Sequence, residues 1–267
     1  MTVILMKYPK LFKEATGNDP YPYQLQLAIG EQLPVLLSVP TGVGKTAAVI
    51  LGWLYRRCFA ARKISEQTPR RLVYCLPMRS LVEQTKQCAD AWLSKLIDCG
   101  HLQPNDVSAH LLMGGADDTH WDEFPERNSI LIGTQDMLLS RALNRGYGMS
   151  RYRWPMHFGL LNNDSLWVMD ETQLMGVGLT TTAQMQGFRG KLGTVGTCDS
   201  LWMSATLDTG PLETIDHPKP EEGFRLLRLG EEDLADEKVQ QRIESVKPLE
   251  KIKPSLSPDS DGKSYRV

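Results

Sequence analysis

The chain has 267 residues, a formal net charge of −2, and an ordinary balance of 41% hydrophobic and 23% charged residues. This length allows one large domain or two small ones, and the composition is typical of a globular protein. The longest uninterrupted apolar stretch, AAVILGWLY, is too short to span a bilayer, and the amino terminus lacks a signal-peptide pattern. The five cysteines form no CxxC pair, which argues against a zinc ribbon or a disulfide framework. We therefore expect a cytoplasmic protein without a membrane partner.

Strands and helices are predicted to alternate along most of the chain. Short apolar runs typical of buried strands are followed by longer helical patterns up to residue 207. The predicted strands cover 34–40, 70–77, 107–114, 129–134, 164–171, 200–206 and 224–230. The predicted helices cover 45–60, 80–100, 135–144, 180–192 and 236–245. This alternation indicates an α/β fold, with a mainly parallel sheet and helices on both of its faces.

The chain is predicted to divide into four segments. Residues 1–22 are an N-terminal lead-in, and residues 23–207 form the main α/β domain. Residues 208–246 form a short extension with one strand and one helix. Residues 247–267 are rich in proline, serine and charge, which is typical of a polar linker.

The segment LLSVPTGVGKTAAVI has the pattern of a phosphate-binding loop. Gly42, Gly44, Lys45 and Thr46 fit the form G-x-G-K-[ST], although Val39 stands where the strict motif has its first glycine. Glycines let backbone N–H groups turn towards phosphate oxygens, and the following helix points its positive end at them. We expect Lys45 to reach the β- and γ-phosphates of ATP and Thr46 to bind Mg²⁺. A Gly-rich turn with a chance Lys-Thr pair is the alternative, which the flanking strand and helix disfavour.

A second apolar strand, in SLWVMDETQLMG, ends in two adjacent acids. ATP hydrolysis needs such a strand, because it delivers a carboxylate to Mg²⁺ next to the phosphate loop. We expect Asp170 to bind Mg²⁺ and Glu171 to polarise the attacking water. A solvated strand end is the alternative, and the phosphate loop upstream argues against it.

Further short motifs occur in a recognisable order. PYPYQ precedes the phosphate loop, LPMRSLVEQT follows the second predicted strand, and GG, GTQDML, DETQ and SAT come next. This order resembles the first RecA-like domain of a superfamily 2 helicase. LPMRSLVEQT, SRYRWPMHFGLLNNDSLWVMDETQLMG and SATLDTGPLETIDH resemble the CRISPR-associated helicase–nuclease of type I systems, most of all subtype G (formerly U). Members of that family are recruited by an RNA-guided Cascade complex to unwind and degrade DNA.

The resemblance implies roles for individual residues. Residues binding ATP and Mg²⁺ would be Gln24 (for adenine), Thr41, Gly42, Val43, Gly44, Lys45, Thr46, Asp170 and Glu171. Residues coupling hydrolysis to strand movement would be Ser204, Ala205 and Thr206. Residues touching the backbone of single-stranded DNA would be Arg79, Gln84 and Thr134. One departure is DETQ, which is neither DEAD nor DEAH and so does not place the chain in the RNA-helicase branches.

The window 141–163 is basic and free of acids. Within it, arginines alternate with aromatic residues, and Arg151 and Arg153 lie at its centre. Arginine neutralises phosphates and aromatic faces stack on bases, so this window is a candidate DNA contact. The alternative is a solvated basic loop whose aromatic side chains pack on the domain.

Two parts of the resembled family are missing from the sequence. No arginine after Thr206 lies in the Q-x-x-G-R-x-x-R motif of a second RecA-like domain, and no histidine is followed by aspartate, as a His-Asp nuclease requires. We therefore expect these domains to be partners supplied elsewhere, and the chain to be a fragment, a split-gene product or a truncated protein. On its own it should hydrolyse ATP barely above background, because the arginine finger is absent.

Three other functions remain open. The chain could be a nucleotide and DNA binding module without turnover, or part of a general cytosolic DNA helicase unrelated to CRISPR. A P-loop metabolic kinase would leave SAT and GTQDML unexplained, and no phosphate-acceptor site is visible.

Overall fold

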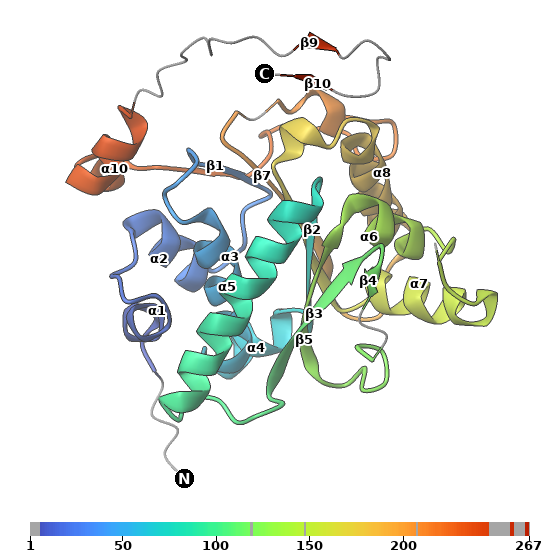
Figure 1. Ribbon diagram of the computed structural model, residues 1–267, viewed down its shortest axis with the longest axis horizontal. Coiled ribbons are helices and arrows are strands. Elements are labelled where there is room, and N and C mark those ends of the chain that lie inside the picture. Colours follow the sequence, from blue (N-terminus) through green and yellow to red (C-terminus); the bar gives the residue numbers. More distant parts are fainter. Residues whose placement is uncertain are drawn as a thin grey trace.

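A computed structural model describes residues 6–117, 120–146, 148–206, 208–245, 257–258 and 265–266. Its centre is an eight-stranded sheet with the strand order β4-β3-β5-β2-β6-β7-β1-β8 (Figure 1). The strands are β1 (Leu36–Ser38), β2 (Arg71–Leu76), β3 (Val107–Met113), β4 (Ala116–Asp117), β5 (Asn128–Thr134), β6 (Ser165–Asp170), β7 (Cys198–Ser204) and β8 (Leu226–Arg228). Neighbouring strands pair in parallel except at the edge, where β4 runs antiparallel to β3.

Helices cover both faces of this sheet (Figure 1). One face carries α1 (Tyr8–Thr16), α2 (Pro22–Ile29), α3 (Lys45–Cys58), α4 (Arg62–Gln67) and α5 (Arg79–Asp98). The other carries α6 (Gln135–Ala142), α7 (Trp154–Asn162) and α8 (Val177–Leu192). This layered arrangement confirms the predicted α/β fold with a mainly parallel sheet.

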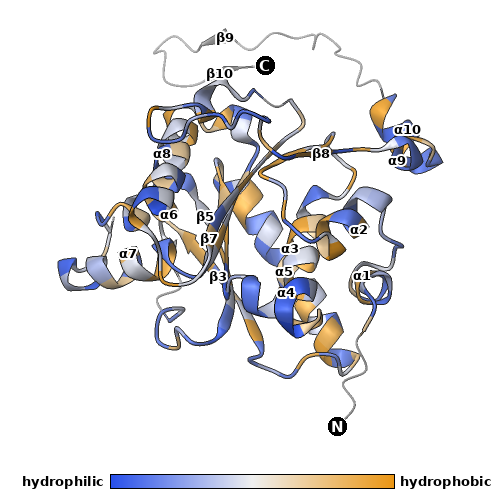
Figure 2. Ribbon diagram, turned by 180° about the vertical axis from the view of Figure 1, so that it is seen from behind, coloured by the Kyte–Doolittle hydropathy of each residue, from blue (hydrophilic) through white to orange (hydrophobic). Residues whose placement is uncertain are grey.

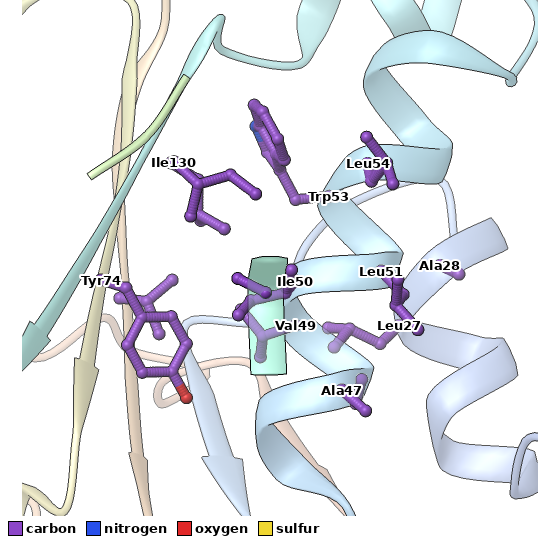
Figure 3. Close-up of a cluster of buried hydrophobic side chains, with 14 of the residues drawn as sticks. Leu27, Ala28, Ala47, Val49, Ile50, Leu51, Trp53, Leu54, Tyr74 and Ile130 are labelled. Atoms are coloured by element: carbon purple, nitrogen blue, oxygen red, sulfur yellow. The ribbon is translucent and has the colours of Figure 1, made fainter. Parts of the chain in front are cut away.

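Two apolar cores lie between the sheet and its helices. All residues of the central strands β2 and β6 are buried, as expected for parallel strands covered on both faces. In Figure 3, Val49 and Ile50 of α3 point towards Tyr74 and Ile130 of the sheet, while Leu51 lies next to α2. The short helix α4 has no buried residue and is largely hydrophilic (Figure 2). The helix α3 is therefore held between the sheet and α2, which fixes its first residue, Lys45.

The predicted strands are all present, and the structure adds elements that were not predicted. These are α1, α2, α4, α7, β4 and α9 (Glu231–Leu234). The extension contains β8, α9 and α10 (Glu237–Ile243), so it has two short helices where one was predicted. The helix α9 escapes a periodicity argument because it is a single turn of four residues. The predicted linker 247–267 lies mostly outside the described residues, which include only the short pair β9 (Ser257–Pro258) and β10 (Tyr265–Arg266) there.

No helix in the described part of the chain is long and apolar enough to cross a membrane.

Two glycines of α8 offer a matched test of its packing. A Cβ at Gly187 would lie 2.0 Å from the backbone oxygen of Asp216, whereas a Cβ at Gly190 would meet nothing within 4 Å. We expect Gly187→Ala to lower the free energy of unfolding by about 1–3 kcal/mol through overpacking. Gly190→Ala should raise it by about 0.5–1 kcal/mol, since alanine is the better helix former. Urea unfolding of both variants measures the two effects, and equal effects would contradict the close approach at Gly187.

Candidate active site

The phosphate loop joins the end of β1 to the first turn of α3. Gly42 and Gly44 have φ angles of +86° and +80°, in the left-handed region that favours glycine. At Gly44 the approach is also close, because a Cβ there would lie 2.7 Å from Nε2 of Gln24. The loop ends at Lys45, the first residue of α3, so the amino terminus of that helix faces the same space. The sequence pattern is thus folded as a phosphate cradle requires.

The side chain of Lys45 is buried and its charge lacks a hydrogen bond. The residue is 7% exposed, and its Nζ has no hydrogen-bond partner among the described residues. The nearest opposite charge is Oε1 of Glu171, at 3.6 Å. Burying an ammonium group without hydrogen bonds is costly, so such a group marks a place where a ligand completes the site. An oxygen-rich anion such as a phosphate group fits this requirement.

Asp170 lies at the carboxyl end of β6, next to this lysine. Burial raises the pKa of the Asp170 carboxyl to about 6, even though the hydrogen bond from Tyr74 and the charge of Lys45 both lower it. The Tyr74 hydroxyl donates to Oδ2 at 2.8 Å, and it also interacts with the Thr46 hydroxyl. A carboxylate and a threonine hydroxyl that both interact with the Tyr74 hydroxyl offer oxygen ligands of the kind that Mg²⁺ binds. The two residues predicted to bind the metal are therefore brought together, through Tyr74.

Glu171 starts a chain of contacts that leads to β7. It adopts a left-handed backbone conformation, with φ of +54°. Its Oε2 accepts a hydrogen bond of 2.6 Å from Nε2 of Gln173, whose Oε1 lies 2.6 Å from Oγ of Ser204. Ser204 Oγ in turn accepts a bond from the backbone N–H of Thr206 at 3.0 Å. The predicted catalytic and coupling residues thus form one connected network, in which Ala205 contributes no side-chain bond.

Gln24 braces the phosphate loop from α2. It is 1% exposed; its Oε1 accepts from the Tyr21 N–H at 2.9 Å, and its Nε2 donates to the Gly44 carbonyl at 3.1 Å. Both ends of the amide therefore contact protein backbone. The residue also lines a cavity of about 970 Å³ beside the loop, so its predicted contact with adenine remains a prediction. Thr41 is exposed at the start of the loop.

Two of the predicted DNA contacts lie together near the same edge of the sheet. Arg79 begins α5, after β2, and Thr134 ends β5. Both line a cavity of about 880 Å³ that also includes Gly114 and the first residues of α8. Gln84 is exposed on α5 and does not line that cavity. The motifs following β2, β3 and β5 therefore converge on one hollow.

Arg151 and Arg153 lie elsewhere and differ from each other. Arg153 pairs with Asp122, which also accepts a bond of 2.6 Å from Nε2 of His157. Although burial raises the pKa of the Asp122 carboxyl, the bonds from Arg153 and His157 hold it below its usual value. Arg151 is exposed, with its guanidinium 5.9 Å from the centre of the Trp154 ring. The basic window is thus divided between an internal ion pair and a solvated arginine.

Sequence reasoning missed Tyr74 and Gln173 as site residues. Tyr74 lies in an apolar strand run, where a tyrosine is ordinarily core, and its phenol bonds a strand 96 residues away in the sequence. Gln173 stands inside the quoted motif DETQ but received no role. For Gln173 the available signal was its place two residues after the acidic pair, whereas the sequence around Tyr74 gave no signal.

The family comparison agrees with this geometry. The DEAD/DEAH box helicase model matches residues 22–215. The chain belongs to the DEAD/DEAH box helicase family. It carries the RecA-like domain of superfamily 2 helicases, although its box reads Asp-Glu-Thr-Gln. No curated protein sequence matches the chain.

Solved helicase structures share the fold at low sequence identity. The DUF1998 helicase MrfA bound to DNA has a TM-score of 0.57, with 17% identity over 85% of this chain and 30% of MrfA. The DEAD-box helicase Mss116 bound to single-stranded RNA has a TM-score of 0.55, with 17% identity over 85% of this chain and 43% of Mss116. The yeast DEAD-box splicing factor Prp28 has a TM-score of 0.51, with 17% identity over 78% of this chain and 46% of Prp28. This helicase chain spans less than half the length of each of these proteins.

The hydrogen bond between Tyr74 and Asp170 is predicted to affect how Mg²⁺-nucleotide affinity depends on pH. A metal-binding carboxylate must be ionised, so Mg²⁺-nucleotide affinity should fall as the pH drops through about 6, the value to which burial raises the Asp170 pKa. Tyr74→Phe removes a bond that lowers this pKa, so its affinity should begin to fall at a higher pH. Calorimetric titrations of wild type and variant between pH 5 and 8 measure the difference.

Comparing the proteins at each pH cancels the titration of the nucleotide itself. Tyr55→Phe, a change in a half-buried tyrosine farther along α3, is the matched control. The two curves should converge near pH 8, and superimposable curves at all pH values would contradict the role of Tyr74.

Proposed function

We propose that this helicase domain binds ATP and Mg²⁺ and serves as the motor of a superfamily 2 DNA helicase or translocase. The observation that carries the proposal is the buried Lys45 ammonium, which has no hydrogen bond among the described residues and faces Glu171 across 3.6 Å. A buried cation at the start of a helix, above two left-handed glycines, is what a phosphate chain requires.

Each residue of the site has a distinct task in this proposal. The backbone N–H groups of the loop and the Lys45 ammonium hold the phosphates, and Thr46 and Asp170 hold the metal. Bound Mg²⁺ would offset charge on the phosphate oxygens and polarise the terminal group. Glu171 orients the attacking water and accepts its proton, since its carboxylate lies 3.6 Å from the Lys45 ammonium that would hold the phosphates. Gln173 joins Glu171 to Ser204 by hydrogen bonds, and Ser204 bonds Thr206. A movement of the Glu171 side chain is transmitted along these bonds to the end of β7.

Nucleic acid is proposed to lie over the hollow that contains Arg79 and Thr134. Positive charge and the free backbone N–H groups at the amino termini of α5 and α6 favour contacts to phosphates rather than to bases. The preference for single-stranded DNA rests on the resemblance to the type I CRISPR helicase–nuclease. So do a role in CRISPR interference and the partners: a second RecA-like domain, a His-Asp nuclease and an RNA-guided Cascade complex. A general DNA helicase without a CRISPR role would use the same residues.

A binding module without turnover is the second candidate. It differs from the helicase in whether an arginine finger completes the site, and the given sequence has no arginine-finger motif after Thr206. In comparable enzymes a supplied arginine is worth roughly 10³–10⁵ in turnover. Within the helicase proposal, the 267-residue chain therefore binds Mg-ATP but hydrolyses it barely above background, and a second lobe added in trans restores turnover. Failure of such a lobe to raise the ATPase rate would favour the binding module.

Lys45→Ala tests the phosphate site directly. Removing one charge-assisted contact should weaken Mg-ATP binding roughly 10- to 100-fold while the fold is kept. Lys63→Ala, on the exposed helix α4, is the matched control and should bind as the wild type does. Isothermal calorimetry gives the affinities, and circular dichroism checks the fold. An unchanged affinity for Lys45→Ala would refute the phosphate cradle.

Arg79→Ala and Arg153→Ala separate the two candidate nucleic-acid surfaces. If Arg79 contacts a phosphate, its loss should weaken binding to all sequences alike and reduce the salt slope by roughly one unit. Arg153→Ala should lower thermal stability instead, because it leaves Asp122 buried with a partner removed. Arg151→Ala reports on the solvated arginine of the window. Fluorescence anisotropy with a labelled single strand at several salt concentrations distinguishes these outcomes, and a smaller slope for Arg153→Ala alone would place the DNA at the window.

A further inference from the structure

The carboxyl-terminal extension reaches back to the phosphate loop. If a Cβ were added at Gly42, it would lie 3.6 Å from Cδ of Arg242. Arg242 belongs to α10, some 200 positions away in the sequence, and its side chain is exposed. Among the described residues, no carboxylate lies within ion-pair distance of its guanidinium, whereas Arg62, Arg70 and Arg153 each have such a partner. The extension therefore places a cation against the loop that the helicase motifs do not include.

The position of α10 is anchored on both sides. Asp236 caps the helix, accepting from the backbone N–H groups of Lys238 and Val239 at 2.8 and 3.2 Å. Val239 is fully buried in the core that also contains α2 and α3. Just before α10, Oδ1 of the buried Asp233 accepts from the Tyr23 N–H at 3.0 Å. The hydroxyl of Tyr23 in turn donates to the carbonyl of Val43 at 2.7 Å, so the extension and the phosphate loop share one hydrogen-bonded support.

The cavity between these elements lies at one end of the phosphate loop. Its volume of about 970 Å³ is at the upper end of the range typical of small-molecule sites. It is lined by Tyr21 and Gln24 of the α2 region, by Gly42 and Gly44 of the loop, and by Arg242. Lys45, Asp170 and Glu171 do not line it. Because these three residues mark the terminal phosphates, the cavity lies where the nucleoside end of the ligand would leave the loop.

Two of the side chains that line the cavity, the Tyr21 ring and the Arg242 guanidinium, are planar and suit a flat aromatic ligand. The ring of Tyr21 is half-buried and runs nearly parallel to that of Tyr23, with an angle of 14° between the planes. Burial raises the pKa of the Tyr21 phenol most. Asp236 raises this pKa further and Arg242 lowers it, so both charges lie near the ring. A guanidinium plane stacks on aromatic faces, and a purine offers such a face.

We propose that Arg242 is a nucleoside-binding residue, supplied by the extension and not by the helicase motifs. Its guanidinium packs on the purine–ribose half of the nucleotide, while Lys45 and the loop hold the phosphates. The proposal rests on the proposed nucleotide function and adds that α10 contributes to nucleotide binding. The extension is then part of the ATP site.

The test compares Mg-ATP with Mg-tripolyphosphate, which has the phosphates without the nucleoside. Arg242→Ala should weaken Mg-ATP binding roughly 3- to 30-fold and leave tripolyphosphate binding unchanged. Arg242→Lys keeps the charge but not the plane, and should recover only part of the loss. Arg62→Ala, an exposed arginine on α4, is the matched control. Val239→Ala loosens the anchor of α10 and should reproduce the selective loss, with thermal melts confirming that the domain stays folded.

The outcomes separate this inference from the proposed function. If the wild-type chain binds neither ligand, the nucleotide function itself fails. If it binds both and Arg242→Ala loses them equally, Arg242 contacts phosphate and the nucleoside assignment is wrong. Tighter ATP binding by Arg242→Ala would show that the side chain obstructs the cavity, and unchanged ATP binding would show that it does not contact the ligand. Either result overturns the proposal.

Discussion

The buried ammonium of Lys45 is the constraint on which the rest of the site depends. It is 7% exposed and has one carboxylate within ion-pair distance, at 3.6 Å. Placing that charge below the surface is tolerable only because the ends of β1 and β6 deliver the lysine and the acids to the same edge of the sheet. The strand between them in the sheet is β7, which carries Ser204. The strand order therefore determines which side chains can approach the Lys45 ammonium.

The residues that support the site are also residues of the core. Tyr74 packs against Ile50 of α3 and presents its hydroxyl to Asp170 (Figure 3). Gln24 is buried between α2 and the loop and bonds backbone at both ends. Because these groups have fixed partners on the apolar side, their polar ends cannot move freely. The packing of the domain thereby preorganises the phosphate site.

Much of the site could be predicted because its residues follow strands directly. Asp170 and Ser204 each end an apolar run, and Lys45 follows such a run after one short loop; parallel strands bring these ends together. The contacts that were missed join segments far apart in the sequence. Arg153 and Asp122 are 31 residues apart, so an acid-free window could not reveal that the arginine is paired from outside. Arg242 could be excluded from an arginine-finger motif, but only the packing of Val239 and Asp233 brings it to Gly42.

The two ends of the site differ in charge, and this difference affects which groups of a ligand each end can accept. At the Lys45 end, one ammonium faces the two carboxyl groups of Glu171 and Asp170. A polyphosphate anion would be repelled there unless a divalent cation accompanies it. The raised pKa of Asp170 expresses the same imbalance, since burial and Glu171 both favour its protonated form. At the other end the cavity is lined by three basic and two acidic side chains, namely Lys13, Lys238 and Arg242 against Asp19 and Asp236. Under the proposed function, phosphates would therefore enter the Lys45 end only together with a divalent cation, whereas the Arg242 end would attract the nucleotide without one.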